Sequence, residues 1–497
     1  MDPEQEKTSR IAILAFAIPL GLFAIVLAAA VIISVVGHAK WNRTKADLLA
    51  RGEKLSLRDF EPPPVPDTEN FYADEVWWEI TDRAGNPGLL APSGRRQIDV
   101  LETPLSKESI ESLRRLVPDF RDQTSCTLKA AVTAAAAALE KSSDVEARKS
   151  LARFILTEIE PANPLLERIN GLLDRPLART PLVYDQALLV STDHLAPILN
   201  ISQALRARAT AAIAEENASS AATDIRDQFR LAATLSGEPL LLTALVRMSI
   251  LAFAAECVRV GMNGWEDADL ETFESQIAQI DLLSDLQTTV RAERGGLNDT
   301  VDALSNKRMT LSDLYGGRPT PPLLSFGFVI YTAISMEADR AKSNLQMQQW
   351  IDALSAPREH GLTPSAFALP RKSTGLDWFH QRLFTEMVVP NIETATSKAA
   401  RIQSQLDLLR IACALERFRR AGGAYPSTLE ELVPAFLPTI PSDIMTGAPM
   451  RYIRDTPDDF RLWSVGWDRI DDGGVAPTSR GSTAKGDWIW ESPPAAR

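Results

Sequence analysis

Residues 425–432 read Tyr425-Pro426-Ser427-Thr428-Leu429-Glu430-Glu431-Leu432, and this stretch predicts a turn followed by a short helix. Ser427 stands where a helix cap is expected, and Glu430, three residues later, completes a capping box. In such a box each of the two side chains accepts a hydrogen bond from a backbone N–H group near the start of the helix. The stretch therefore marks the change from long helices to short elements.

Patterns on both sides of this stretch complete a small domain. A long helical pattern over Ile392–Ala421 ends at Gly422-Gly423, because glycine commonly terminates helices. Two strand-like segments follow at Met450–Arg454 and Phe460–Val465, and a third lies at Asp487–Glu491. We therefore expect residues 392–497 to form an α+β domain with a three-stranded antiparallel sheet.

Residues 106–391 show apolar side chains at helical spacing almost throughout, for example at Leu151, Ile155 and Ile159. Short connections between such helices favour antiparallel packing, which gives a large all-helical body, either a bundle or an irregular solenoid. Pro239–Val258 is apolar enough to resemble a membrane helix, but the charge of Arg247 near its centre favours a buried helix of this body. The chain is thus predicted to be mainly α.

An apolar run without charge, Ile11–Val36, follows a short N-terminal tail at 1–10. As a helix it would be roughly 39 Å long, enough to cross an apolar bilayer core of about 30 Å. The alternative is a cleaved signal peptide, since Gly37-His38-Ala39 offers small residues, but such peptides have a shorter apolar stretch. We predict an uncleaved transmembrane helix. Residues 37–105 would then hold a juxtamembrane helix and a linker, with Pro62–Pro66 as a stiff spacer between bilayer and body.

Composition argues against some functions and leaves others without support. The 497-residue chain has a formal net charge of −12, which argues against a nucleic-acid surface, because such a surface needs Lys and Arg. The cysteines Cys126, Cys257 and Cys413 lie far apart in apolar helical contexts, so we expect buried thiols and no disulfide framework. The four histidines lack metal-ligand spacing, and the common nucleophile and nucleotide motifs do not occur.

The C-terminal part, about Leu406–Trp490, resembles the globular domain of the G-type major pseudopilin of type II secretion. The resemblance lies in the order of turns and strands at Tyr425–Leu432, Pro441-Ser442-Asp443, Arg451-Tyr452, Leu462–Gly466 and Asp471–Gly474. It implies a periplasmic domain that packs against other proteins. The rest of the chain departs from that family. Thr8–Ile11 shows no peptidase-cleaved leader, and the helical body separates the apolar run from the tail.

The whole chain also resembles a family of uncharacterised single-span bacterial membrane proteins with this layout. That resemblance lies in Arg51–Leu55 before Pro62–Asp67, Leu245–Arg247, Trp265–Asp267, Arg291–Arg294, Ser464–Trp467 with Asp471–Gly474, and Gly486–Trp490. It implies the bacterial inner membrane. The Lys and Arg residues after the apolar run would keep the body in the cytoplasm, but long domains translocate largely regardless of charge. Together with the pseudopilin resemblance, this leads us to expect a periplasmic body.

The best candidate site consists of four aspartates in and after a glycine-bearing loop: Asp468, Asp471, Asp472 and Asp487. Carboxylate oxygens on a flexible loop suit calcium, which takes about 6–8 oxygen ligands. In the pseudopilin family a calcium ion pins the corresponding loop, and the resemblance matches Asp468 and Asp487 to its acidic positions. The alternative is a solvated turn, for which Asp and Gly are equally suited.

Two other groups allow a chemical and a structural interpretation. Four tryptophans lie near the C-terminus: Trp463, Trp467, Trp488 and Trp490. They would form either a platform for a ligand or part of a small hydrophobic core, and we favour the core. The acids around Glu266–Glu271 would serve either acid/base chemistry or the start of a helix, and we favour the helix start. Arg291, Glu293 and Arg294 are expected to form salt bridges between helices.

From these patterns we expect a non-enzymatic, membrane-anchored protein of the cell envelope. Its tail would dock other envelope proteins or a second copy of the chain, and its helical body would act as a scaffold. The alternative is a membrane-anchored envelope hydrolase with its active site in the helical body, which would require paired carboxylates converging in a cleft. A small-ligand sensor is a third interpretation, which the short tail at 1–10 disfavours because it leaves no output domain.

Overall fold

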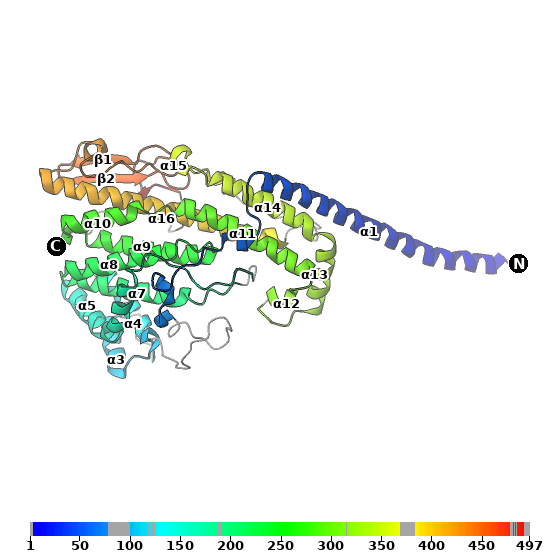
Figure 1. The fold of residues 1–497 in the computed structure, drawn as a ribbon, viewed down its shortest axis with the longest axis horizontal. Coiled ribbons are helices and arrows are strands. Elements are labelled where there is room, and N and C mark those ends of the chain that lie inside the picture. Colours follow the sequence, from blue (N-terminus) through cyan, green and yellow to red (C-terminus); the bar gives the residue numbers. More distant parts are fainter. Residues whose placement is uncertain are drawn as a thin grey trace.

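The computed structural model describes residues 3–77, 100–117, 120, 125–185, 190–314, 316–367, 383–477, 481, 483 and 485–491, with the backbone alone for 3–19, 323 and 383–391. Parts of the expected segments 1–10, 37–105, 106–391 and 392–497 therefore lie outside the described residues. Most described elements are helices, and one three-stranded antiparallel sheet lies near the C-terminus (Figure 1). The predicted mainly helical fold with a small C-terminal sheet is confirmed.

The helices and strands have the following bounds. The α-helices are α1 (Pro3–Ala50), α3 (Lys107–Leu116), α4 (Leu128–Lys141), α5 (Val145–Ile159), α6 (Asn163–Leu172), α7 (Leu195–Ala214), α8 (Ala218–Ala233), α9 (Leu241–Val260), α10 (Asp267–Ala278), α11 (Leu282–Ser305), α12 (Leu311–Leu314), α13 (Pro322–Ile334), α14 (Met336–Ala353), α15 (Pro357–His360) and α16 (Leu383–Gly422). The 3-10 helices are η1 (Leu57–Phe60), η2 (Phe71–Ala73), η3 (Val100–Glu102), η5 (Glu160–Ala162), η7 (Met262–Gly264), η8 (Pro364–Phe367) and η10 (Leu429–Leu432). The strands are β1 (Arg451–Thr456), β2 (Asp459–Ser464) and β3 (Trp488–Ile489).

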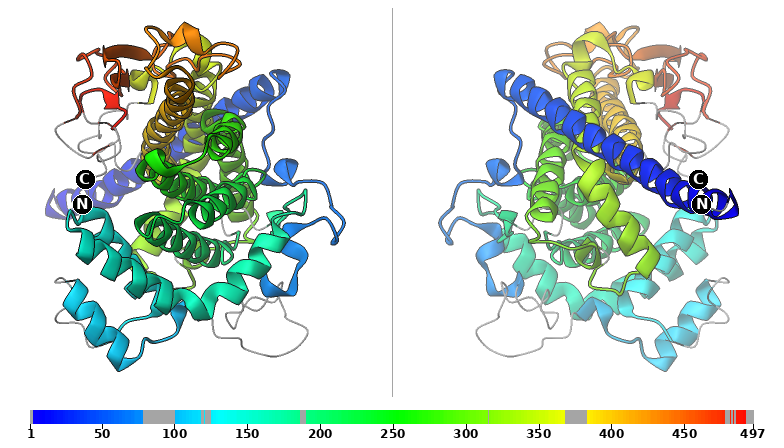
Figure 2. Two further views of the ribbon diagram at one scale, coloured as in Figure 1. Left: turned by 90° about the vertical axis from the view of Figure 1, so that its left-hand side faces the viewer. Right: turned by 90° about the vertical axis from the view of Figure 1, so that its right-hand side faces the viewer.

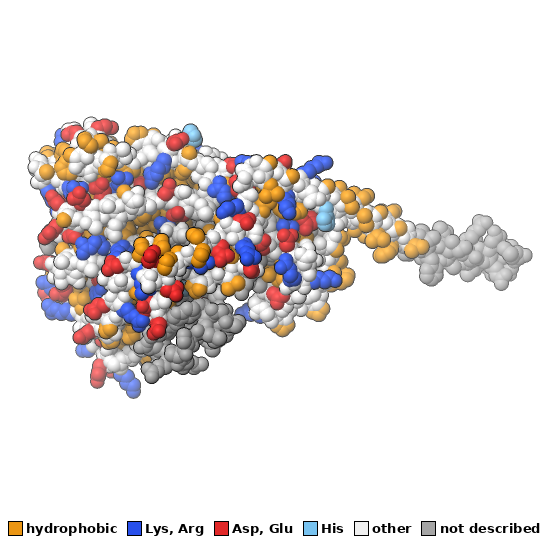
Figure 3. All heavy atoms as spheres, viewed as in Figure 1, with side chains coloured by type: hydrophobic (Ala, Val, Ile, Leu, Met, Phe, Trp, Pro, Cys, Tyr) orange, Lys and Arg blue, Asp and Glu red, His pale blue; other side chains and the backbone are white. Residues whose placement is uncertain are grey.

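Helix α1 runs without interruption for 48 residues, from the apolar run into the body. Side chains between Leu20 and Val36 are mostly exposed, whereas Trp41 and Leu48 are buried in contacts with the body. The projecting part of α1 leaves one end of the molecule, and hydrophobic side chains cover its described surface (Figures 1 and 3). By length and composition this apolar helix is suited to be a membrane anchor or a signal sequence.

The helices of the body stack side by side in roughly their chain order. Helices α4 and α5 pack against each other and on α7, α7 packs on α8, α8 on α9, and α9 on α16. Figure 1 shows α7, α8, α9 and α16 as successive layers of this stack. A single hydrophobic core runs through these helices, so the stack is one packed unit.

The apolar stretch at 239–258 forms most of α9, which lies inside the body as predicted. It packs against α7, α8, α11 and α16. Arg247 is buried on α9, where it forms an ion pair with Asp285 and its Nε donates to the Ala232 carbonyl at 3.1 Å. A buried guanidinium with such partners is stable in a protein interior, whereas the same charge in lipid would be costly.

The C-terminal sheet has the order β1-β2-β3, with Tyr452 opposite Leu462 and Ser464 opposite Trp488. It packs on α16 through a separate apolar cluster that includes Ile411. Residues of the same domain also belong to the large core of the body, among them Trp488. Because α16 contributes to both clusters, it joins the helical body to the α+β end, and the expected boundary at 391/392 falls within this one helix.

The predicted capping box is wrong by one residue. Helix η10 is preceded by Thr428, whose backbone is extended, and Glu431 closes the box. Glu431 Oε1 accepts hydrogen bonds from the N–H groups of Thr428 at 3.0 Å and Ser427 at 2.7 Å. The helical turn therefore starts one residue later than the Ser427–Glu430 spacing predicts.

The segment that follows α1 is fixed to the body by buried polar contacts. The Glu53 carboxylate accepts hydrogen bonds from Arg294 at 2.5 Å and from Arg291 at 3.2 Å, both on α11. Asp299, also on α11, accepts from the Ser56 hydroxyl at 3.0 Å and from the Leu57 N–H at 2.8 Å. We call the segment 51–60 the neck.

The neck approaches α11 so closely that only glycine fits at one position. A Cβ atom on Gly295 would lie 2.6 Å from the Ser56 carbonyl carbon and 2.7 Å from the Leu57 nitrogen. Because the chain has already joined the body here, Pro62–Pro66 comes after the first body contacts. The expectation that this segment spaces the body from the bilayer is therefore wrong.

Candidate functional site

Asp487 is the centre of the acidic glycine loop. Its Oδ2 accepts hydrogen bonds from the N–H groups of Asp472 at 3.0 Å and Gly474 at 2.7 Å, which ties the loop to the start of β3. Its Oδ1 is buried and has no hydrogen-bond partner among the described residues. Burial raises the pKa of Asp487, against the two backbone hydrogen bonds that act to lower it. The loop is thus built around one buried carboxylate with one oxygen left unpaired.

Two of the other predicted aspartates have different partners. Asp471 Oδ1 accepts from Trp463 Nε1 at 3.0 Å, and its Oδ2 pairs with Arg451 at 3.0 Å. The hydrogen bond from Trp463, together with Arg451, lowers the pKa of Asp471. Asp468 Oδ1 accepts from the N–H of Ile470 at 3.2 Å, within its own turn.

The four carboxylates do not converge on a common point. Within the described ranges, no group of three or more His, Cys, Asp or Glu side chains is placed to hold a metal ion. Asp471 fits a cation poorly because Arg451 already neutralises it. Asp487 fits better, since its unpaired buried oxygen lacks a partner and calcium prefers carboxylate oxygens. Asp472 is next to it through its backbone and exposes its side chain. The charges of Asp471 and Asp472 both act on Asp487, so the structure brings these three aspartates near one another, although Asp471 is paired with Arg451.

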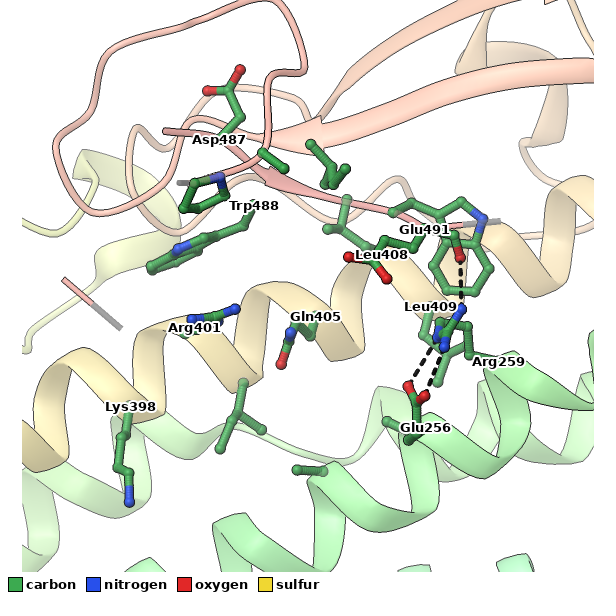
Figure 4. Close-up of a pocket in the computed structure, with 17 residues that line it drawn as sticks. Glu256, Arg259, Lys398, Arg401, Gln405, Leu408, Leu409, Asp487, Trp488 and Glu491 are labelled. Carbon is green, nitrogen blue, oxygen red and sulfur yellow. Dashed lines mark hydrogen bonds and ion pairs between the residues drawn. The ribbon is translucent and has the colours of Figure 1, made fainter. Parts of the chain in front are cut away.

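A groove of about 680 Å³ lies between the C-terminal sheet and the helices α9 and α16 (Figure 4). This volume is within the range of sites that bind small molecules or peptide segments. Apolar side chains such as Leu408 and Leu409 line it from α16, and Trp488 and Trp490 line it from β3 and the residue after it. Asp487 borders the groove, but its carboxylate points away from the helices in Figure 4.

One end of the groove is rich in hydrogen-bond donors. Lys398, Arg401 and Gln405 follow one another along α16, at spacings of three and four residues that place them on one face. Lys398 and Gln405 are exposed, and Arg401 Nη1 donates to the Gly481 carbonyl at 3.1 Å. Trp488 is 3 % exposed, and its buried Nε1 has no acceptor among the described residues.

The other end of the groove holds one cation and two carboxylates, Arg259 with Glu256 and Glu491. Arg259 on α9 forms two hydrogen bonds to the Glu256 carboxylate, at 2.9 and 2.6 Å, and its Nη1 donates to the Glu491 carbonyl at 3.3 Å. Figure 4 shows these contacts closing that end. At the opposite end, exposed Lys398 forms no ion pair with the described residues, so an acidic ligand would be favoured there.

The tryptophans mostly serve the core, as predicted. Trp463, Trp467 and Trp488 are buried, and Trp490 is partly exposed. Trp488 and Trp490 also border the groove, so these two have both a packing role and a place in the candidate site.

The acids at 266–271 mark a helix start, as predicted. Helix α10 begins at Asp267 with Glu266 before it, Asp267 pairs with Arg420 at 3.1 Å, and Asp269 pairs with Arg226 at 3.4 Å. Of the expected salt-bridge residues on α11, Arg291 and Arg294 pair with Glu53.

Glu293 differs from its two neighbours on α11. Its carboxylate accepts a hydrogen bond from the Leu241 N–H at 2.9 Å, at the start of α9. Burial raises the pKa of Glu293. Glu293 thus satisfies a helix end where a salt bridge between helices was expected.

The helical body buries carboxylates in polar contacts. Asp224 is held by Arg208 through hydrogen bonds at 2.5 and 2.9 Å, and Asp227 accepts from Asn170 at 2.5 Å. Burial raises the pKa of both aspartates. Neither lines the groove, and a nearby small cavity beside Glu238 holds about 10 Å³, which is room for about one water molecule. Both carboxylates are paired with polar side chains inside the body.

Sequence reasoning missed the groove and the neck. The groove has a weak local signal, because Lys398, Arg401 and Gln405 form a polar row on a helix that is otherwise largely buried. The neck has none, because Glu53 and Arg294 are 241 positions apart and no local spacing connects them.

No protein-family model, no curated protein and no solved structure matches this chain.

Proposed function

We propose that the protein is a membrane-anchored periplasmic protein that docks other envelope proteins, or a second copy of itself, and acts as a scaffold without catalysing a reaction. The single observation behind this proposal is the groove at the C-terminal domain, which combines apolar walls with exposed Lys398 and with an indole N–H of Trp488 that has no acceptor among the described residues. The C-terminal sheet lies at the end of the molecule away from the projecting part of α1 (Figure 1). A body anchored through α1 would present this groove away from the bilayer.

Two further features support the anchor and the location. The apolar side chains of α1 between Leu20 and Val36 are exposed over a length that suits a bilayer, and the neck fixes α1 to the body. The resemblance of residues 406–490 to a type II secretion pseudopilin supports the periplasmic side and a docking role.

The chemistry of the groove favours an extended polypeptide segment as its ligand. Such a segment would supply a carbonyl oxygen to Trp488 Nε1. An acidic side chain of the segment would pair with Lys398, and an apolar one would contact Trp490. Unpaired buried donors are costly, so a ligand that satisfies Trp488 Nε1 gains that free energy on binding.

We also propose a structural calcium ion at the acidic loop, bound through Asp487 Oδ1 with Asp472 as its neighbouring carboxylate. Its role would be to hold the loop that precedes β3 and so to fix one side of the groove.

Site-specific photo-crosslinking tests the docking proposal. A photoreactive residue replaces Lys398 in the full-length protein, in the native membrane, and a matched variant carries it at exposed Lys107 on α3, far from the groove in the chain. We expect a discrete adduct, with an envelope protein or with a second copy, from position 398 only, and its loss when Arg401→Glu is added. The absence of an adduct at 398, or equal adducts at both positions, would contradict groove docking.

A further inference from the structure

Helix α13 (Pro322–Ile334) is short, contains no charged residue, and leaves one apolar face uncovered. Phe326 is 66 % exposed and Val329 is 63 % exposed, and Leu324 and Ile330 are also exposed. Isolated exposed apolar residues are common, but several on one short helix mark a surface that needs a partner. Phe326, Val329 and Ile330 lie on one side of the helix, and we call these three side chains the α13 face.

The opposite side of α13 is firmly packed. Phe328 and Tyr331 contact the main hydrophobic core, and the Tyr331 hydroxyl donates to Asp339 Oδ2 at 2.6 Å. Burial raises the pKa of Tyr331 well above its usual range, so the phenol stays protonated and keeps donating. The α13 face is therefore held outward by an ordered helix.

The position of α13 identifies what covers this face. Helix α13 contacts α1 and lies at the end of the body from which α1 projects (Figure 1), the end seen in the right view of Figure 2. On α1 the exposed apolar side chains continue to Val35 and Val36, just before the helix packs on α14 at Gly37. The apolar surface of the span thus continues onto the body at α13.

The charges of the segment that precedes α13 suit contact with anionic lipid headgroups. The segment between α11 and α13 carries the exposed cations Lys307, Arg308 and Arg318 against one exposed carboxylate, Asp313. Anionic headgroups attract such cations by about 1 kcal/mol each near the surface. A helix of 13 residues is about 20 Å long, too short to cross an apolar core of about 30 Å but suited to lie in its interface.

We propose that the α13 face is a second membrane contact, inserted into the lipid interface beside α1. This inference rests on the proposed anchoring of the chain through α1. It makes the attachment two-point: α1 crosses the bilayer, and α13 sets how close the body lies to the surface and which side of it faces the lipid.

Lipid quenching in proteoliposomes tests this proposal. The full-length protein, with Cys126→Ser to remove the partly exposed thiol, receives one new cysteine labelled with an environment-sensitive fluorophore. Phe326→Cys reports on the α13 face, Leu27→Cys on the span, and Val145→Cys, similarly exposed at the start of α5, serves as control. The vesicles contain phosphatidylglycerol, phosphatidylethanolamine and a nitroxide-labelled phospholipid, and circular dichroism checks that each variant is folded.

We expect severalfold stronger nitroxide quenching at 27 and 326 than at 145, with the 326 label shielded from aqueous iodide. Quenching at 27 but not at 326 would overturn the α13 contact and leave the anchor intact. Absence of quenching at 27 would overturn the anchor itself and the α13 contact with it. A 326 label that is shielded from iodide yet not quenched by lipid would show a second protein copy on this face, and would also overturn the proposal.

Discussion

The fully buried guanidinium of Arg294 donates a hydrogen bond to the Glu53 carboxylate at 2.5 Å, between residues 241 positions apart. This contact joins the neck to α11, in the middle of the body. Together with the packing of α1 on α14, it fixes the orientation of α1 relative to the helical stack.

Removing Glu53 should be severe. Glu53→Ala leaves the Arg294 charge buried without its carboxylate, and we expect a loss of about 3–5 kcal/mol in the free energy of unfolding. The matched control is Arg51→Ala, which removes an ion pair to Asp352 in which both side chains are about half exposed. That variant should lose about 0–1 kcal/mol. Denaturant unfolding of the detergent-solubilised proteins measures both, and equal losses would contradict the role of Glu53.

Acid should weaken the same contact. Burial acts to raise the pKa of Glu53, but the hydrogen bond and charge of Arg294 outweigh it, so the pKa is lowered from its ordinary 4.5. A lowered carboxyl pKa contributes stability above the ordinary pKa, and this contribution is lost as the pH falls through the folded-state pKa. At pH values below 4.5, the unfolding free energy of the wild type should therefore decrease with falling pH more steeply than that of Glu53→Gln. Identical dependences of the unfolding free energy on pH in the two proteins would contradict the lowered pKa of Glu53.

Asp407 on α16 should show the opposite dependence. Burial raises its pKa to about 6 from an ordinary 3.8, although Arg358 pairs with it. With a raised pKa, the folded state binds the proton more tightly, so this contribution is present below pH 3.8 and is lost as the pH rises through 6. Relative to wild type, Asp407→Asn should gain stability between pH 4 and 6. Parallel thermal-melting profiles over this range would refute the assignment.

Gly295 should not tolerate a methyl group. A Cβ there would lie 2.6 Å from the neck backbone, so Gly295→Ala must displace the neck, and we expect a loss of about 1–3 kcal/mol. Gly171, on α6, has no atom within 4 Å of the equivalent Cβ, so Gly171→Ala should be neutral or gain up to about 1 kcal/mol through helix propensity. Denaturant unfolding of both variants measures the two changes in unfolding free energy. Equal changes would contradict the close approach of the neck to Gly295.

Calcium should stabilise the acidic loop through Asp487. Added calcium is expected to raise the melting temperature of the full-length protein by a few degrees, because an ion bound only to the folded state stabilises it by mass action. Asp487→Asn should abolish this rise, whereas Asp468→Asn, whose carboxylate bonds within its own turn, should keep most of it. A wild-type melting temperature that is the same in calcium and in chelator would exclude the ion.

Local patterns predicted much of this fold. The glycine pair after Ala421 ends α16, alternating apolar residues form β2, and the charge of Arg247 correctly assigned α9 to the interior. These features depend on neighbours in the chain, whose spacing the sequence displays directly.

Contacts between distant segments were not predictable in this way. The Ser427–Glu430 box was misplaced because two overlapping Ser/Thr–Glu spacings occur, and only the extended backbone of Thr428 decides between them. The sequence suggested that four aspartates bind a metal ion. In the structure the Asp471 carboxylate instead accepts hydrogen bonds from Arg451 and Trp463, which no local spacing in the sequence connects to it. The groove depends on the docking of β3 over α16, which no local pattern encodes.

The neck couples the tilt of α1 to the orientation of the body. A helix of 48 residues is about 72 Å long. Its C-terminal part packs on α14, and the neck that follows it is bonded to α11, so the helix runs unbroken from the apolar run into the body. If the span tilts to match a thinner or thicker bilayer, the body would therefore rotate with it as one unit. In the proposed anchored state the C-terminal domain, at the end of the molecule away from the projecting part of α1, would move the farthest, so the thickness of the bilayer would change the position of its groove.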